Sequence, residues 1–255
     1  MNRIFHPLWR QGGRLLVLLL LCTLSLQLYF LLRIGLMAVL DPQSTTFQRS
    51  EAWRLAYQKH QIVWSQQWMD DVALSKNIKR AVIASEDAGF IDHGGVDWDA
   101  IEKAWERNQR EEARLAKLRP RGGASALKTK PAPKVVGGST ITQQLAKNLF
   151  LSSERHFVRK GQEFVITLML EQVLSKRRIL DIYLNSVEWG EGVFGAQAAA
   201  QHYFRVDAKQ LSANQAARLA VMLPAPKRFE KRPNSPYVLG RAGTIEARMG
   251  GVDVP

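Results

Sequence analysis

The clearest hydrophobic pattern in the chain is an apolar run near its N-terminus. The run from Leu15 to Leu32 contains no charged residue, and after Arg33 it continues as IGLMAVL. At about 1.5 Å per helical residue, eighteen or more apolar residues are enough to cross a bilayer. Because Arg3, Arg10 and Arg14 precede the run, the positive-inside rule places the N-terminus in the cytoplasm.

A cleaved signal peptide is the alternative interpretation of this run, since a basic flank followed by an apolar core describes both. The core is longer than that of a usual signal peptide, and no clear small-x-small cleavage site follows it. We therefore predict a cytoplasmic segment over 1–14, a membrane anchor over 15–40, and a remainder that lies outside the cytoplasm.

The next stretch, residues 41–70, is predicted to be a linker and membrane-proximal segment, with DPQSTTFQRS (41–50) leaving the membrane. Four aromatic residues follow among polar ones, and they fit either an amphipathic membrane-surface segment or the core of a globular domain. They are Trp53, Tyr57, Trp64 and Trp68.

Apolar residues spaced by threes and fours dominate the rest of the chain, and strand-like alternation is scarce, so the domain over 71–249 is predicted to be mainly α. The predicted helices are Val72–Glu86, Trp98–Ala116, Thr140–Leu149, Arg159–Leu174, Arg177–Asn185 and Ala213–Met222. Residues 119–136, rich in Lys, Arg, Pro and Gly, predict a flexible basic loop, and 250–255 an irregular tail.

Composition narrows the class of partner. A formal net charge of +13 over 255 residues favours a polyanion: nucleic acid, an anionic membrane surface or a phosphorylated substrate. The predicted location outside the cytoplasm argues against nucleic acid. Cys22 is the single cysteine, so no intrachain disulfide can form.

A carboxylate on an apolar helix face is the first candidate for chemistry. Glu86 follows Ile78 and Val82 at steps of four, so it shares their face of the helix. Burial there would raise its pKa towards the range useful to a general base. The alternative is an ion-paired glutamate at a helix end, with Gly94-Gly95 forming a structural turn after it.

The segment GGSTITQQLAKNLFL, residues 137–151, is the second candidate. Ser139 is predicted to be the N-cap of a helix whose free N–H groups could bind an anion. Thr140, Gln144 and Lys147 then form one polar stripe that ends in a cation. A solvent-exposed helix face is the alternative explanation of this stripe.

The third candidate is the segment RKGQEFVITLMLEQVL, residues 159–174. Glu163 aligns with apolar residues one and two turns later, which predicts an inward carboxylate, although a surface pair with Arg159 is the alternative. Two inward glutamates near Lys147, Arg159 and Lys160 suit a reaction that expels a phosphate or pyrophosphate. The base removes a proton while the cations hold the departing negative charge.

These segments, in this order, resemble the family 51 glycosyltransferases, the polymerases of peptidoglycan. The family pattern E-D-x-x-F-x-x-H-x-G is matched by Glu86, Asp87, Phe90, His93 and Gly95. The block GGSTITQQ-x-x-KN is matched over 137–148, and R-K-x-x-E by Arg159, Lys160 and Glu163. KRRILDIYLN (176–185) and RLAVMLPAP (218–226) match two further blocks, so the resemblance covers roughly 73–249.

The resemblance implies a mainly α, lysozyme-like glycosyltransferase domain with a small membrane-proximal lobe, preceded by one transmembrane helix. The chain most resembles the monofunctional biosynthetic form of the family. The stretch between the first two blocks, which holds the basic loop, is longer than is usual in that form.

The resemblance also implies the reaction. Glu86 would take the proton from the 4-hydroxyl of lipid II, and that oxygen would attack the anomeric carbon of the growing lipid-linked chain. Undecaprenyl pyrophosphate would leave in a single inverting displacement that forms a β-1,4 bond without a covalent glycosyl-enzyme.

The roles carried over from the family concern two catalytic residues and a set of substrate-binding ones. Glu163 would orient the donor-site cations or bind a divalent cation, Mg²⁺ or Mn²⁺, and no organic cofactor is expected. The predicted substrate-binding residues are Asp87, Phe90, His93, Ser139, Thr140, Gln143, Gln144, Lys147, Asn148, Arg159 and Lys160.

The expected partners are lipid II, the growing lipid-linked glycan, the bacterial cytoplasmic membrane and other proteins of wall synthesis or division, but not nucleic acid. Two rival functions differ in class. A membrane-bound lytic enzyme would cleave glycan strands, and a scaffold of the wall-synthesis machinery would do no chemistry. A lytic substrate lacks pyrophosphate and has less use for the cation cluster, and Glu86 and Glu163 argue against the scaffold.

Overall fold

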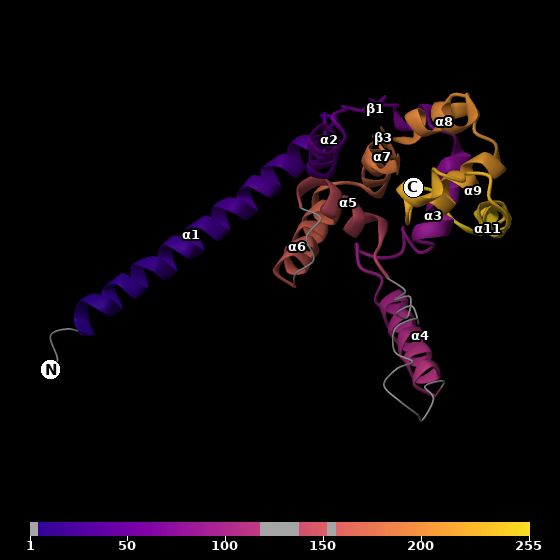
Figure 1. Cartoon of the computed structure of the whole chain (residues 1–255). Helices are drawn as coiled ribbons and strands as arrows, with labels where there is room; N and C mark the ends of the chain where they lie inside the picture. Colours follow the sequence, from indigo (N-terminus) through magenta and orange to yellow (C-terminus); the bar gives the residue numbers. More distant parts are fainter. Residues whose placement is uncertain (1–4, 118–137, 152–156) are drawn as a thin grey trace.

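The computed structural model describes residues 5–117, 138–151 and 157–255, and it is mainly helical, as predicted (Figure 1). The helices are α1 Phe5–Met37, α2 Thr46–Lys59, α3 Lys76–Glu86, α4 Trp98–Lys117, α5 Ile141–Phe150, α6 Phe157–Val173, α7 Lys176–Ser186, α8 Ala196–Phe204, α9 Ala213–Met222, α10 Pro226–Phe229 and α11 Pro236–Glu246. Short 3₁₀ turns cover η1 Asp71–Ala73, η3 Ala208–Gln210 and η4 Met249–Gly251, and the strands are β1 Ser65–Gln66, β2 Glu188–Gly190 and β3 Val193–Phe194.

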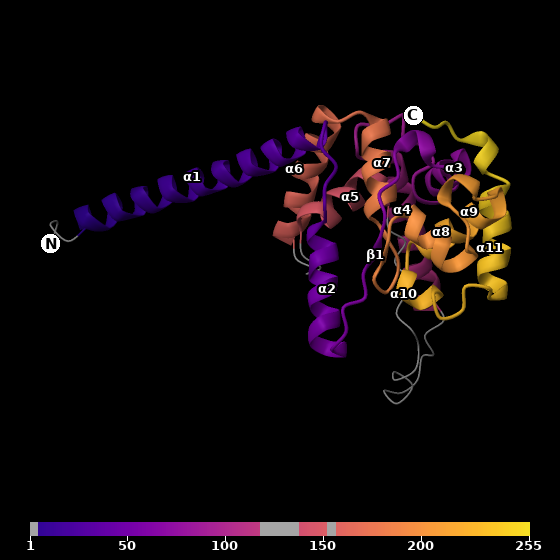
Figure 2. The same ribbon diagram turned by 90° about the horizontal axis from the view of Figure 1, so that it is seen from above.

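Helix α1 extends away from the body of the molecule, as Figures 1 and 2 show. Its stretch from Gln11 to Met37 is long and apolar enough to cross a membrane. The C-terminal part of α1 is attached to the body: Gln27 exchanges two hydrogen bonds with Gln162 of α6, at 2.9 and 3.0 Å, and Phe30 packs edge-on against Phe150. Helix α1 is therefore joined to the domain by packed side chains as well as by the chain itself.

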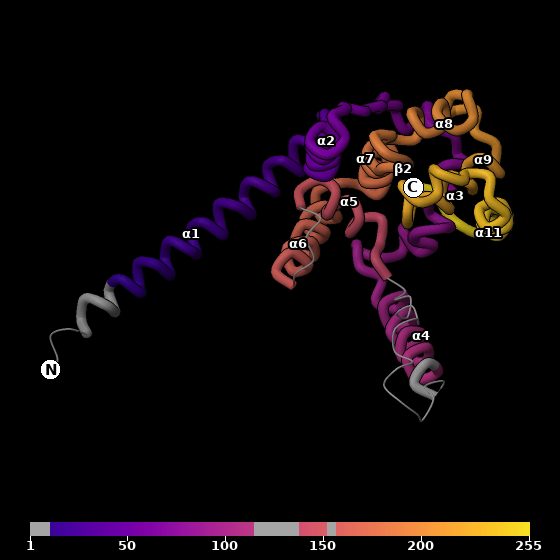
Figure 3. The backbone as a smooth tube through the Cα atoms, viewed as in Figure 1, coloured from indigo at the N-terminus to yellow at the C-terminus, as the bar shows by residue number. Residues whose placement is uncertain are grey.

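The body is built around α3, α9 and α11, which pack on one another, and α7, which packs on α5. The continuous tube in Figure 3 shows α3, from the first half of the chain, lying among the C-terminal helices. Trp189 is fully buried in this core, and its indole N–H donates to the carbonyl of Leu219 at 3.1 Å. Small side chains such as Ala216 and Ala220 let α9 approach its neighbours closely.

A small three-stranded sheet in the order β1-β3-β2 ties the segment after α2 to the body. Strand β1 pairs in parallel with β3, placing Ser65 opposite Val193. Gly192 makes the close approach feasible, because it has a φ of +73° and a Cβ there would lie 2.3 Å from the carbonyl oxygen of Val63.

The predicted linker over 41–50 is wrong in its second half, because α2 begins at Thr46. The N-cap is Thr45, whose hydroxyl accepts the N–H of Gln48 in a capping box. Gln48 also donates to the carbonyl of Ser186, at 3.0 Å. The inward face of α2 carries Gln48 and Glu51, so hydrophobic periodicity gave no sign of the helix.

The four aromatic residues of this region differ in burial. Trp53 is 77% exposed and Tyr57 84% exposed, so neither belongs to the core. Trp64 packs against Phe194, with the ring centroids 5.1 Å apart, and the partly buried Trp68 packs against the core. The core alternative is therefore wrong for the pair on α2, and the membrane-surface alternative stays a prediction for it.

The predicted irregular tail over 250–255 is also corrected in part. The 3₁₀ turn η4 includes residues 250 and 251, and Val252 is buried in the hydrophobic core. The apolar side chain of Val252 holds the end of the chain on the body. The predicted basic loop over 119–136 lies outside the described residues.

A partly buried ionic cluster joins α2, β2 and α10. Lys227 contacts Glu51 at 2.5 Å and lies 3.6 Å from Oε1 of Glu188. That buried oxygen has no hydrogen-bond partner among the described residues. Burial raises the pKa of Glu188 to about 7, the charge of Lys227 opposes the rise, and the charges of Glu51 and Glu230 add to it.

We predict that Glu188→Gln flattens the pH dependence of stability. Between the ordinary carboxyl pKa of about 4.5 and the folded value of about 7, folded Glu188 retains a proton that the unfolded chain releases, so stability falls as pH rises. The amide variant should therefore be more stable than wild type at pH 8, by about 2 kcal/mol, and similar at pH 5. Thermal unfolding of full-length protein in detergent measures this; equal pH slopes for both proteins would contradict it.

Candidate active site

Glu86 is the last residue of α3, one turn beyond the buried Val82. Its side chain is half-buried, and burial raises the pKa of Glu86 above the ordinary glutamate value. Hydrogen bonds from Gln144 and Ser85 oppose the rise, and the charge of Asp87 adds to it. The desolvation expected from the helix periodicity is thus present, and such a carboxylate suits a general base near neutral pH.

A hydrogen-bond chain fixes this carboxylate. Gln144 on α5 donates from Nε2 to Oε2 of Glu86, at 3.0 Å. The hydroxyl of Tyr183, on α7, donates to Oε1 of the same glutamine at 2.9 Å. Because the amide oxygen is already engaged, the amide must present its N–H group to Glu86. Tyr183 is fully buried and was not among the predicted site residues, although it lies in one of the matched blocks.

Asp87 connects the end of α3 to the start of α5. Its Oδ1 accepts from Nε2 of His93 at 2.8 Å, and its Oδ2 accepts the backbone N–H of Ile141 at 3.0 Å. Nδ1 of the same histidine accepts the N–H of Gly95, which leaves the ring proton on Nε2. Both carboxylate oxygens therefore hold the turn after α3 against the first residue of α5.

Gly95 lies where this turn meets α6. It has a φ of +89°, and a Cβ there would lie 2.7 Å from Cγ of Glu171 and 2.8 Å from Cγ2 of Thr167. Its carbonyl accepts the hydroxyl of Thr140 at 2.7 Å. The glycine of the motif is thus required by both backbone conformation and space.

The predicted N-cap of α5 is wrong by one residue. Thr140, not Ser139, is the N-cap: its hydroxyl accepts the N–H of Gln143, and the Gln143 side chain accepts the N–H of Thr140. Ser139 is exposed. Because Asp87 already accepts the first N–H of α5, the protein itself supplies an anion at this helix start.

A second group of charges lies on α6, the helix that packs against α5. Glu163 is 4% exposed, so the predicted inward carboxylate is observed. Arg159 donates to its Oε2 at 2.9 Å, and Lys160 contacts its Oε1. Two cations share one carboxylate, which leaves the group with one positive charge, and the side chain of Lys160 is half exposed.

Comparison with known proteins assigns the family. A family model described as Transglycosylase matches residues 56–250. The chain belongs to the transglycosylase family. A protein named biosynthetic peptidoglycan transglycosylase from Burkholderia thailandensis is 50% identical over 91% of this chain and 83% of its own length. A protein of the same name from Cupriavidus pinatubonensis is 49% identical over 98% of this chain and 93% of its own length.

The transglycosylase is thus a glycosyltransferase, as the sequence motifs indicated. Several of its predicted substrate-binding residues make their described contacts with the protein itself. Asp87, Phe90, Thr140, Gln143 and Asn148 are buried. Direct contact of these residues with substrate stays a prediction.

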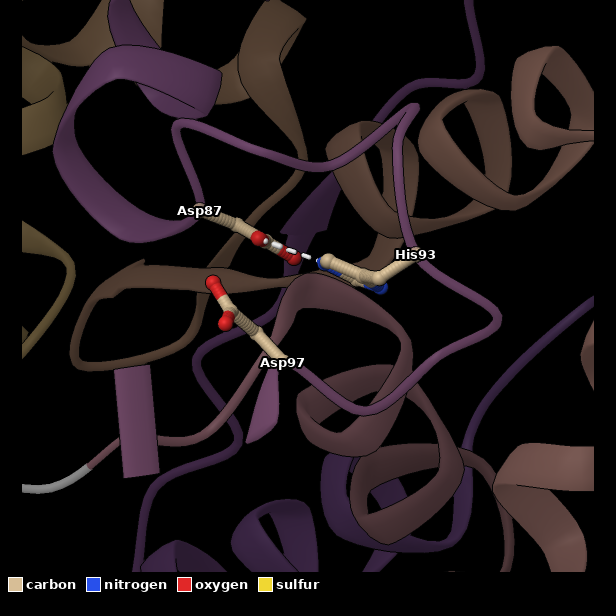
Figure 4. A group of neighbouring side chains, drawn as sticks. All are labelled: Asp87, His93 and Asp97. Carbon is tan, nitrogen blue, oxygen red and sulfur yellow. Dashed lines mark hydrogen bonds and ion pairs between the residues drawn. The ribbon is translucent and has the colours of Figure 1, made fainter. Parts of the chain in front are cut away.

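Among the described residues, one group of three side chains could supply metal ligands: Asp87, His93 and Asp97, whose ligand atoms lie within 4.8 Å of one another (Figure 4). These atoms are already engaged, because the first two bond each other and Oδ1 of Asp97 accepts the N–H of Ala100 at 2.7 Å. The group therefore fits a hydrogen-bonded turn better than a metal site.

We predict that Tyr183→Phe lowers kcat of the transglycosylase about tenfold, because the amide of Gln144 loses the donor that fixes its orientation against Glu86. Tyr203→Phe is the matched control, since that hydroxyl also donates one hydrogen bond, to the carbonyl of Trp189. Equal losses of kcat in both variants would show a general structural effect instead.

We also predict that Gly95→Ala lowers the free energy of unfolding by about 3 kcal/mol, through the positive φ and the contact with α6. Gly94→Ala is the control, because a Cβ there meets nothing within 4 Å. Chemical denaturation of both variants measures the difference, and comparable stability of the two would refute the argument.

Proposed function

We propose that the chain is the peptidoglycan glycosyltransferase that polymerises lipid II into β-1,4-linked glycan strands and releases undecaprenyl pyrophosphate. The observation that carries the proposal is the half-buried Glu86, held by Gln144 at the end of α3. The names of its relatives, biosynthetic peptidoglycan transglycosylases, supply the substrate class.

Glu86 is the general base of the proposed reaction. Its carboxylate takes the proton of the acceptor 4-hydroxyl as the oxygen bonds to the anomeric carbon of the donor chain. The bond from that carbon to the pyrophosphate oxygen breaks, and the electron pair leaves with the pyrophosphate. A single displacement inverts the α-linked donor to a β-linkage, so a covalent glycosyl-enzyme is not needed.

The leaving pyrophosphate needs positive charge. Arg159 and Lys160 on α6, with Lys147 on the adjacent α5, form the cation set that we assign to it. Gln143, Gln144, Ser139 and Thr140 would shape the donor side of the cleft. Of these, Ser139 is exposed and has a side chain accessible to a ligand.

Glu163 is assigned to orienting these cations, because each of its oxygens already contacts Arg159 or Lys160. Binding of Mg²⁺ or Mn²⁺ to Glu163 would require displacement of at least one of these side chains. A divalent cation stays a prediction, and the proposed reaction has no step that passes through one.

The proposed location is the outer face of the bacterial cytoplasmic membrane. Helix α1 would cross the bilayer once, with the N-terminus in the cytoplasm and the catalytic body outside, because three arginines precede the apolar run. The membrane and the lipid-linked glycan are the partners that this arrangement requires. Proteins of wall synthesis or division are further proposed partners.

We predict that Glu86→Gln lowers polymer formation at least 100-fold, because the amide cannot accept a proton. Full-length protein is incubated in detergent with labelled lipid II, and lysozyme-sensitive polymer is measured. Glu102→Gln, at an exposed position of α4, is the control. The acid limb of the wild-type pH–rate profile should also lie above the ordinary glutamate range, since the raised pKa protonates the base at higher pH.

Two results would contradict this function. Retention of more than about a tenth of wild-type activity by Glu86→Gln would remove Glu86 from the role of base. Folded wild type that makes no polymer but cleaves preformed glycan would be a lytic enzyme, and folded protein with neither activity would be a scaffold.

A further inference from the structure

Arg33 interrupts the apolar face of α1 close to its outer end. The uncharged run that precedes it spans eighteen residues, about 27 Å of helix, which is close to the thickness of a bilayer's hydrocarbon core. In the membrane orientation proposed above, on which this inference rests, Arg33 therefore lies at the level of the outer phosphate headgroups.

The guanidinium of Arg33 has no hydrogen bond or ion pair with protein in the described part of the chain. An arginine keeps its charge at any physiological pH. A charge next to hydrocarbon is costly unless it meets water or a counter-ion, and a long side chain reaches towards the interface for that reason. The position of Arg33 thus allows an ion pair with an anion at headgroup level.

A pocket of about 310 Å³ lies beside Arg33, between the end of α1 and the start of α2. Arg49, from α2, is a second cation in its lining. Leu36, Met37 and Leu40 provide an apolar part of the wall. Paired cations next to an apolar wall suit a ligand with an anionic head and an aliphatic tail.

Arg49 is held in place before any ligand binds. Its Nη1 donates to the carbonyl and the hydroxyl of Ser44, at 3.1 and 3.0 Å, and its Nη2 donates to the hydroxyl of Thr46 at 3.1 Å. Three of the five guanidinium N–H groups are used, and two, including that on Nε, have no partner among the described residues. Two such donors match the oxygens of a phosphate.

Asp41, the acidic residue in the pocket lining, does not neutralise these cations. It is paired with Arg178 at 2.7 Å. The same arginine donates to the carbonyls of Met37, at 2.8 Å, and Leu40, at 3.1 Å, so it also caps the end of α1. The pocket therefore carries a positive charge, and Arg178 joins its residues Leu40 and Asp41 to α7.

We propose that the pocket lined by Arg33 and Arg49 binds the phosphate headgroup of an anionic membrane phospholipid, with the acyl chains lying along the turns of α1 that precede Arg33. The exposed Leu28 and Leu32 of that helix provide the apolar surface for the chains. The lipid would fix the angle between the anchor and the catalytic body, because the two arginines come from α1 and α2.

The test is native mass spectrometry of full-length protein in detergent, titrated with phosphatidylglycerol or with phosphatidylcholine of the same acyl chains. Wild type should bind phosphatidylglycerol with at least tenfold preference. Arg33→Gln and Arg49→Gln should each lose about tenfold in affinity for phosphatidylglycerol, because each removes one charge-assisted hydrogen bond. Arg33→Lys keeps the charge and should lose less affinity. Arg241→Gln, at an exposed position on α11 remote from α1, should bind as wild type does.

Unchanged phosphatidylglycerol affinity in the double variant Arg33→Gln/Arg49→Gln would overturn the proposal, as would equal affinity of wild type for the two phospholipids. Displacement of the bound phospholipid by equimolar undecaprenyl pyrophosphate would also overturn it and assign the pocket to the substrate carrier. Circular dichroism of each variant confirms folding. Lipid binding is measured without turnover, so failure here is distinguishable from failure of the proposed polymerase activity.

Discussion

The geometry of the candidate site depends on the carboxylate of Asp87. One oxygen holds His93 and the other holds the first N–H of α5, so the end of α3 and the start of α5 are joined at one side chain. This junction lets Gln144, one turn into α5, reach Glu86. Without it Glu86 would lie at a frayed helix end, hydrated and with an ordinary affinity for protons.

The residues around Glu86 make neutral hydrogen bonds, whereas those around Glu163 on α6 make ion pairs. Tyr183 and Gln144 supply directed hydrogen bonds to a carboxylate that burial has made more basic. Arg159 and Lys160, by contrast, share Glu163 and present charge. Glu86 lies on α3, and the cations lie on α6, which packs against α5, the helix that carries Gln144. A carboxylate and cations so placed suit a reaction that removes a proton and expels an anion.

Helices α1 and α2 are joined to the body by polar contacts. Arg178 caps α1 and pairs with Asp41, while α2 is held by Gln48 and by the ionic cluster around Lys227. These polar contacts hold α1, α2 and the body together as one unit. They also explain why the linker prediction failed, because α2 buries polar groups that hydrophobic periodicity cannot detect.

The sequence by itself determined the helical class, the long apolar helix near the N-terminus and the identity of the motif residues, because apolar spacing and ordered motifs are local properties of the chain. Helix α9 was predicted with its observed bounds, Ala213–Met222. Tertiary structure alone decided which motif residues contact one another. The N-cap is Thr140 rather than Ser139, and the hydroxyl of Thr140 also donates to the carbonyl of Gly95. Tyr183 orients Gln144 from 39 residues away along the chain. Contacts between distant segments have no local pattern, since they depend on how helices pack.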